Sequence, residues 1–373
     1  MENSAVAKAI LAKVLNVESI NSYVMSNDIY GDKFLVIPGN GNARWIVPSN
    51  SKLACGVLAQ WKPYGIISLF KWGILRLLYR LDLLKIVPGV VEVNFQKEKN
   101  MVASGKTCVV PVIYVGTPGP QQKAVVTLVE FDTGAAVSIM KVPLSEGAIA
   151  SIKAEALALE SLQKSNFDKA PQLTEFDEAR GISLQTVLPG KLAGGKFNAD
   201  MLDCLLNMPN AGLVTTVDEQ RAQLEIAFNN SESLFQSHQQ ALIKKGLVNI
   251  QGNDDIKLLF THGDFAPWNI KQGKGGCSFF DLEDALHEGL PLWDICHFHF
   301  IQACLFGKTN LIEDMLSNKF VTLYMQAASL TMIVGKQLML LYMLRTVLSI
   351  GQNNASAEYK VFLISKIQTV LDI

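Results

Sequence analysis

The sequence has no excess of either sign of charge, no closely spaced cysteine pair and no internal repeat. Its 373 residues carry 33 Lys and Arg against 34 Asp and Glu, a formal net charge of -1, so no general attraction to nucleic acid is expected. The 6 cysteines form no CxxC pair and no zinc-ligand spacing, as is typical of reduced thiols. The first residues have no continuous apolar segment of the secretory kind. We therefore expect a cytoplasmic globular protein.

Uninterrupted hydrophobic runs of membrane-spanning length are also missing. Residues 65–87 and 328–350 are strongly apolar, but charged side chains interrupt both segments, which argues against spans. We interpret residues 328–350 as a buried helix and residues 65–87 as an amphipathic helix. The basic face of the latter could contact an anionic membrane or a partner, but packing on a sheet is favoured. The interrupting charges are Lys71, Arg76, Arg80, Asp82 and Lys85 in the first segment, and Lys336 and Arg345 in the second.

The pattern that is present predicts an α+β fold of two lobes. Residues 109–142 read as three β-branched strands joined by the turns "GTPGP" and "DTGA", which predicts an antiparallel meander. A helical pattern follows over residues 145–165, then a strand over 181–191, and the rest is mainly helical. We therefore divide the chain into an N-terminal extension of unknown role (1–100), a small sheet lobe (101–188) and a larger helical lobe (189–373).

Three polar side chains stand in an otherwise apolar or glycine-rich stretch, "FTHGDFAPWNIKQGKGGCSFFDLEDA". Asp264 and Asn269 are five residues apart, which suits a short loop in which one faces a hydroxyl and the other a metal ion. Asp281 follows the apolar run "GCSFF", whose strand would hold its carboxylate at an edge. Oxygen ligands of this kind suit magnesium. Each residue alone has a plainer interpretation, Asp264 as a turn residue and Asn269 as a helix cap.

A lysine at the end of the third strand completes the candidate chemistry. Lys141 in "AVSIMKV" emerges from a largely buried sheet and therefore needs a carboxylate partner. On the following helix Glu155 lies within the apolar arc, whereas Glu160 falls just outside it. We therefore expect Lys141 to pair with Glu155, with Glu160 as the second choice.

Taken together, these motifs resemble the aminoglycoside phosphotransferase and choline kinase branch of the protein-kinase-like fold. The matching segments are "VSIMKV", "KAEALALESL", "LPGK", "HGDFAPWN" and "FDLEDA", in the order of that family and over roughly residues 105–300. The resemblance implies that Asp264 is the catalytic base, that Asn269 and Asp281 bind Mg²⁺, and that Lys141, paired with Glu155, binds the phosphates of ATP or GTP. It implies transfer of the γ-phosphoryl group to a hydroxyl of a small molecule that is like an aminoglycoside, choline or a sugar.

The phosphate-binding turn departs from the pattern of protein kinases. "YVGTPGPQQK" is not GxGxxG, and Pro118 and Pro120 lack the N–H groups that cradle phosphates. Contact with the nucleotide would have to come from Gly116, Thr117 and Gly119. This irregular turn leaves an alternative open, a nucleotide-binding pseudokinase that acts as an interaction scaffold.

Other departures bear on the acceptor. Gly263 stands where protein kinases carry an arginine, Leu282 and Glu283 replace the Phe-Gly after the metal-binding aspartate, and no APE motif follows. Those parts order an activation loop and dock a peptide, so a small-molecule acceptor is favoured.

The remaining histidines and a later aspartate are assigned to structure. We expect His262 to brace the loop that carries Asp264. Asp294, in "LPLWDICHF", resembles a later aspartate of that family, which implies that it braces the same loop. His297 and His299, in "HFH", are expected to pack in the core.

Overall fold

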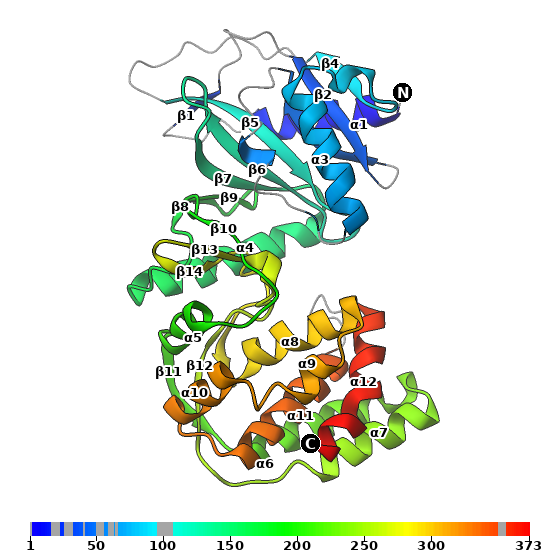
Figure 1. Cartoon of the computed structure of the whole chain (residues 1–373), viewed down its shortest axis with the longest axis vertical. Coiled ribbons are helices and arrows are strands. Elements are labelled where there is room, and N and C mark those ends of the chain that lie inside the picture. The colour runs from blue at the N-terminus through cyan, green and yellow to red at the C-terminus, as the bar shows by residue number, and fades with distance from the viewer. Residues whose placement is uncertain are drawn as a thin grey trace. The chain divides into compact units, whose positions relative to one another are not determined.

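The computed structural model describes residues 2–15, 23–25, 33–39, 42–49, 56–58, 63, 66–94, 107–349 and 356–373. The chain divides into two compact units (Figure 1). Unit 1 comprises Met1–Leu157 and Pro171–Leu188, and unit 2 comprises Ala158–Ala170 and Pro189–Ile373. Each unit is described by itself.

Unit 1 is built on one sheet, in which eight strands follow the order β4-β2-β3-β5-β6-β7-β9-β8 and every neighbouring pair is antiparallel. A ninth strand, β1, pairs in parallel with β5. The expected meander is confirmed in β5, β6 and β7, and described strands of residues 23–94 belong to the same sheet. The strands are β1 (Tyr23–Met25), β2 (Lys33–Gly39), β3 (Asn42–Pro48), β4 (Val91–Asn94), β5 (Thr107–Val115), β6 (Lys123–Glu130), β7 (Ala136–Pro143), β8 (Leu173–Asp177) and β9 (Ile182–Gln185).

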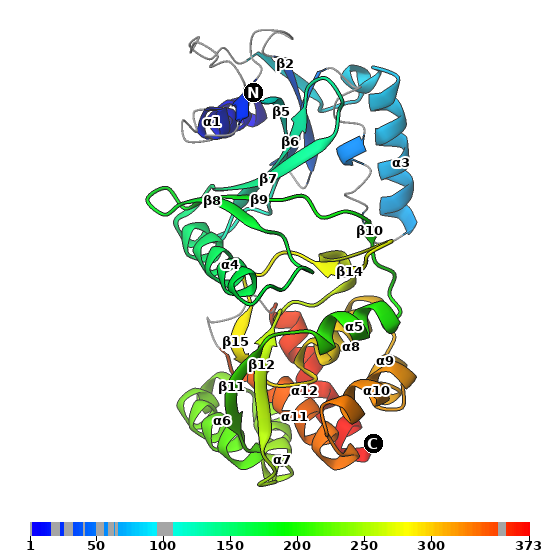
Figure 2. The same ribbon diagram turned by 90° about the vertical axis from the view of Figure 1, so that its left-hand side faces the viewer.

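A helix covers each face of this sheet (Figure 2). Side chains of a strand alternate between the two faces, so Phe34 and Val36 of β2 pack in one apolar cluster with helix α1 (Glu2–Leu15), while Leu35 and Ile37 pack in the other. Helix α3 (Ile66–Arg80) covers this second face. The sheet is therefore buried on both sides, which explains its strongly apolar strands.

The amphipathic helix expected within residues 65–87 is α3, which the short 3-10 helix Leu84–Ile86 follows. Trp72 packs against Trp45 of β3 in a tilted ring contact with centroids 5.6 Å apart, and the Tyr79 hydroxyl donates a 2.7 Å hydrogen bond to the carbonyl of Pro48. The expected packing on the sheet is therefore confirmed for one face of α3.

Helix α4 (Glu146–Lys164) follows β7 and supplies its first part to unit 1. Unit 2 is mainly helical, as expected, with two small three-stranded sheets of order β10-β13-β14 and β11-β12-β15. Its strands are β10 (Lys191–Leu192), β11 (Asn210–Thr215), β12 (Ile256–Thr261), β13 (Ile270–Gly273), β14 (Gly276–Phe279) and β15 (Leu286–Gly289). Its helices are α5 (Ala199–Leu206), α6 (Val217–Ser231), α7 (Ser237–Val248), α8 (Trp293–Phe306), α9 (Asn310–Glu313), α10 (Lys319–Ala327), α11 (Met332–Leu348) and α12 (Ala357–Asp372), with 3-10 turns at Glu232–Leu234 and Pro267–Asn269.

The α+β class expected from the sequence is confirmed. Helix α11 is mostly buried, as expected for residues 328–350. Within the described ranges no single helix has both the length and the apolarity to cross a bilayer. Helices α10 and α11 reach that length and apolarity only as a pair, which is bent by 102°.

The cysteines within the described ranges are free thiols, namely Cys108, Cys204, Cys277, Cys296 and Cys304. Cys55 lies outside those ranges.

Candidate active site

The loop that carries Asp264 begins at the end of β12. Gly263 has φ 83°, and a β-carbon at this position would lie 2.0 Å from the carbonyl oxygen of Asp284. Any side chain would therefore collide with the neighbouring backbone as well as strain its own. This close approach explains why a glycine, and no arginine, stands before Asp264.

Asp294, in the first turn of α8, holds the backbone of this loop through two hydrogen bonds. Its Oδ2 accepts a 2.9 Å hydrogen bond from the N–H of His262, and its Oδ1 accepts one of 3.0 Å from Gly263. Burial raises the pKa of the Asp294 carboxyl, while its interactions with His262 and Gly263 act in the opposite direction. The bracing contact that the sequence predicted for Asp294 is present.

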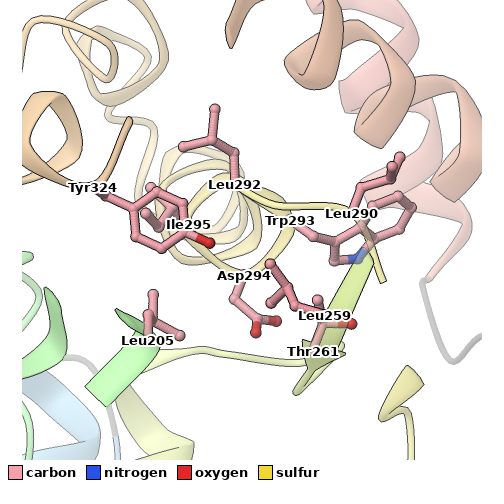
Figure 3. Close-up of a pocket in the computed structure, with 9 residues that line it drawn as sticks. All are labelled: Leu205, Leu259, Thr261, Leu290, Leu292, Trp293, Asp294, Ile295 and Tyr324. Carbon is pink, nitrogen blue, oxygen red and sulfur yellow. The ribbon is translucent and has the colours of Figure 1, made fainter. Parts of the chain in front are cut away.

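A small cavity lies beside Asp294 and confirms that this side chain faces packed structure (Figure 3). Its walls include Thr261 and Leu259 of β12 and Tyr324 of α10, and its volume is about 10 Å³. Such a space has room for about one water molecule. It is therefore no substrate site, and Asp294 acts on the loop through its hydrogen bonds.

His262 is fully buried and joins the loop to the strand that precedes Asp281. Its Nδ1 accepts a 3.2 Å hydrogen bond from the N–H of Asp264, and its Nε2 lies 2.9 Å from the carbonyl oxygen of Phe280. A neutral imidazole with its proton on Nε2 satisfies both contacts. This geometry agrees with the bracing role that the sequence predicted for His262.

The Asp264 carboxylate is held at both oxygens and remains partly open. Asn269 Nδ2 donates to Asp264 Oδ2 at 2.8 Å and to the Asp264 carbonyl oxygen at 3.0 Å. His297 Nε2 lies 2.8 Å from Asp264 Oδ1, and 33% of the Asp264 side chain is exposed. Because a carboxylate offers about four lone-pair sites, Asp264 can still accept a hydrogen bond from a hydroxyl.

The expectation that His297 packs in the core was wrong. It lies one helical turn after Asp294, so α8 presents both side chains to the same loop, Asp294 to its backbone and His297 to the Asp264 carboxylate. His297 Nδ1 is 3.0 Å from the Tyr342 hydroxyl, which lies 2.6 Å from that of Tyr359. The i, i+3 spacing places His297 and Asp294 on one face of α8, but only the packing of α8 shows which loop that face contacts.

His299 agrees with the expectation of a core residue. It is buried, its Nδ1 lies 2.9 Å from the carbonyl oxygen of Ile295, and burial lowers its pKa to about 4. His299 is therefore neutral at physiological pH.

Asn269 and Asp281 flank the open end of one hairpin. Strands β13 and β14 pair Ile270 with Phe279, and Phe280 N–H donates to the Asn269 carbonyl oxygen at 3.0 Å. Asp281 follows at once and has φ 70°, a conformation that non-glycine residues rarely adopt and that often marks functional sites.

The donor set at this hairpin end fits a magnesium ion. The Asn269 amide nitrogen donates to Asp264, so the amide oxygen of Asn269 is the atom that could bind a metal ion. Asp281 would add a carboxylate. Within the described ranges, no group of three or more His, Cys, Asp or Glu could hold a metal ion by itself. A site with few protein ligands is typical of Mg²⁺, which takes its other ligands from water and phosphate.

Lys141 and Glu155, both in unit 1, form the expected ion pair. Lys141 Nζ lies 2.8 Å from Glu155 Oε1 and 2.7 Å from Oε2, and both side chains are buried. The second choice, Glu160, faces Lys164 instead, at 3.9 Å. A buried ion pair is weak evidence of stabilisation, so its presence at this strand end favours a functional role.

The turn between β5 and β6, also in unit 1, is closed by its own backbone. Gly116 N–H donates to the Lys123 carbonyl oxygen at 2.9 Å, so this donor is already engaged. Arg44 of β3 reaches the turn, with its guanidinium 3.3 Å from both the Thr117 hydroxyl and the Val115 carbonyl oxygen. Sequence reasoning missed Arg44, because only the pairing of β3 with β5 brings it here.

The residues singled out in the sequence thus form one group in each unit. Unit 2 brings Asp264, Asn269 and Asp281 together. In unit 1, Lys141 lies on β7 and Glu155 on the following helix α4, while Gly116, Thr117 and Gly119 lie in the turn between β5 and β6 of the same sheet.

Comparison with known proteins gives structural similarity without sequence similarity. No family model and no curated protein matches the chain. Among solved structures, it is similar to an aminoglycoside phosphotransferase, APH(4)-Ia, in a ternary complex with ADP and hygromycin B (10% identity, 71% of this chain and 94% of that chain, TM-score 0.47). It is also similar to the choline kinase LicA from Streptococcus pneumoniae (14%, 71% and 94%, TM-score 0.43) and to the macrolide 2'-phosphotransferase MphH from Brachybacterium faecium (11%, 68% and 91%, TM-score 0.44).

Proposed function

We propose that this chain is a magnesium-dependent phosphotransferase that moves the γ-phosphoryl group of ATP or GTP to a hydroxyl of a small molecule. The observation that carries the proposal is the Asp264 carboxylate, which Asn269 and His297 hold in a partly open position beside the hairpin end that carries Asp281. The buried Lys141–Glu155 pair adds a rigid cation of the kind that binds phosphate oxygens.

In this mechanism the protein positions the reactants and accepts one proton. Asp264 orients the acceptor hydroxyl and takes its proton on a free lone pair. The acceptor oxygen forms a bond to the γ-phosphorus as the bond from that phosphorus to the bridging oxygen breaks, and the nucleoside diphosphate leaves. Asn269 and Asp281 would hold Mg²⁺, whose charge neutralises the phosphate oxygens. His297 and Asn269 keep the Asp264 carboxylate fixed during the transfer.

A groove in unit 2 suits the acceptor. Its volume is about 490 Å³, and β11, β12, β15, α6 and α11 line it. Leu286 in its wall pairs with Thr261, three residues before Asp264. The wall contains Glu288 and Arg345, one charge of each sign, which favours a polyhydroxy or mixed-charge acceptor over a strongly cationic one.

The alternative function is that of a nucleotide-binding pseudokinase that acts as a scaffold. The engaged N–H of Gly116 and the two prolines of the same turn favour it, because they reduce the backbone donors available to phosphates. A thermal-shift measurement with ATP, GTP and Mg²⁺, followed by transfer assays over sugars, choline and aminoglycosides, separates the two functions. Nucleotide binding without transfer to any acceptor or to water would favour the scaffold.

We expect Lys141→Ala to reduce nucleotide use sharply, and Glu155→Gln to reduce it less, because the lysine can still reach the phosphates. Lys141→Ala also leaves the Glu155 carboxylate buried without its partner, at a cost of about 3–5 kcal/mol of folding stability. The nucleotide KM should therefore be measured together with thermal unfolding. Lys153→Ala is the matched control, since Lys153 lies on α4, the helix of Glu155, and forms an exposed pair with Glu178 of the turn after β8. Wild-type activity in both pair variants would contradict the assignment.

We expect His297→Leu to lower kcat by about tenfold to a hundredfold with the nucleotide KM unchanged, because the 2.8 Å contact of His297 Nε2 with the Asp264 carboxylate is lost. His297→Gln retains an N–H donor and should restore most of the rate. Steady-state kinetics of the two variants tests this, with the exposed His238→Gln as control. Equal kcat for the Leu and Gln variants would show that His297 acts only through packing.

A further inference from the structure

Helix α3 has a second face that the sheet does not use. Trp72 and Tyr79 pack on the sheet, whereas Phe70, Ile74 and Leu77 point away from it. At 100° per residue, these three and Leu81 fall within an arc of about 60° on the opposite side of the helix. We call these four residues the α3 stripe.

The α3 stripe is unusually exposed for apolar side chains. The exposed fractions are 71% for Phe70, 44% for Ile74, 56% for Leu77 and 57% for Leu81. Leu83 and Ile86, directly after the helix, are also exposed, at 42% and 73%. A continuous exposed apolar surface of this kind marks an interaction site more often than scattered single residues do.

Basic side chains border the stripe on both sides. Lys71 lies on one flank of the helix, and Arg80 with Arg76 lies on the other. Asp82 is the only acid in residues 66–90. The next acid, Glu92, is already paired with Lys85 at 2.6 Å and with Lys33 at 3.8 Å. The rim of the stripe is therefore positively charged.

The apolar α3 stripe and its basic rim together favour a binding partner whose surface is negatively charged and whose interior is apolar. A second copy that packed through the same stripe would bring two sets of Lys71 and Arg80 together, because a twofold interface places identical patches face to face. A bilayer with anionic headgroups accepts both features, since apolar side chains enter the acyl boundary and basic side chains meet the headgroups.

We propose that the α3 stripe docks unit 1 on an anionic lipid surface, with α3 lying in the plane of the interface. The contacts of Trp72 with Trp45 and of Tyr79 with Pro48 fix the opposite face of the helix to the sheet, so the stripe is presented by a rigid support. The sequence favoured packing on the sheet over membrane contact, and the structure shows that the packing uses only one of the two faces. The inference is independent of the proposed phosphotransferase activity.

Co-sedimentation of the full chain with phosphatidylcholine vesicles, with and without phosphatidylserine, tests this inference. We expect binding only to the anionic vesicles, weakened by added salt. Lys71→Gln with Arg80→Gln should weaken partitioning by about fivefold for each lost cation. Phe70→Ser with Leu77→Ser should weaken it by about tenfold or more, because two apolar side chains no longer leave water. Ile226→Ser, at a 63% exposed position of α6, is the matched control and should bind as the wild type does.

Each contrary result has a definite meaning when thermal unfolding shows that the variants are folded. Absence of binding to anionic vesicles, or equal binding to neutral ones, would overturn the proposal. Wild-type binding by the Phe70 and Leu77 double variant would overturn it as well. A dimer that this double variant converts to a monomer, without lipid binding by the wild type, would assign the stripe to a second copy instead.

Discussion

Asp264→Asn should keep nucleotide binding and lose turnover by about a hundredfold or more, the usual cost of removing a general base. The substitution changes little else. The new amide oxygen can still accept from Asn269, and the new amide nitrogen can face His297, whose imidazole can change tautomer. The loop should therefore retain its conformation, because Asp294 and His262 hold its backbone.

Calorimetric titration with MgATP and a coupled transfer assay measure the two properties separately. Asp255→Asn is the matched control, since Asp255 is exposed and lies just before β12. Near wild-type turnover in Asp264→Asn would remove Asp264 from the chemistry, and the loop would then be a structural turn. Loss of binding together with turnover would show that the carboxylate supports the site itself.

Asp281→Asn should lose turnover together with magnesium-dependent stabilisation by nucleotide. The substitution removes the negative charge that opposes the cation, and the contribution of a metal to transition-state stabilisation is several kcal/mol, or about a hundredfold or more in rate. The defect should therefore differ in kind from that of Asp264→Asn, in which binding persists.

Thermal unfolding with ATP, with and without Mg²⁺, measures this difference. In the wild type we expect Mg²⁺ to add to the shift caused by ATP, and in Asp281→Asn we expect the two curves to coincide. Asp281 has φ 70°, which asparagine tolerates about as well as aspartate, so the variant should fold. A magnesium-dependent shift of wild-type size in this variant would assign the metal to other ligands.

Local patterns in the sequence predicted much of unit 1. The meander of β5, β6 and β7 follows from β-branched runs separated by glycine and proline turns, because side-chain alternation and turn chemistry act over a few residues. The pairing of Lys141 with Glu155 could also be predicted, since helical periodicity fixes which glutamate faces the sheet. Asp294 could be assigned to bracing only through the family resemblance, because it matches a later aspartate in the motif order.

Contacts between distant segments could not be predicted in this way. Arg44 and Thr117 meet only because β3 pairs with β5, and nothing in either segment specifies that neighbour. The membership of β2, β3 and β4 in the sheet depends likewise on long-range pairing. Strand propensity indicates that a segment is a strand and leaves its partner open.

His297 is the clearest case of a site residue whose position depends on long-range packing. By sequence alone it could not be told apart from His299, because both lie in an apolar helix that is buried on most sides. The packing of α8 against α11 and α12 places Tyr342 and Tyr359 beside His297 and turns its Nε2 to Asp264. His299 Nδ1 instead faces the backbone of its own helix, and its ring packs against Phe197. The α+β class, the elements of the meander and the acidic motif could be predicted from local patterns, since these depend on short-range periodicity and spacing. The orientation of α8, and with it the second partner of the Asp264 carboxylate, depended on the packing of helices far apart in the chain, which no local pattern encodes.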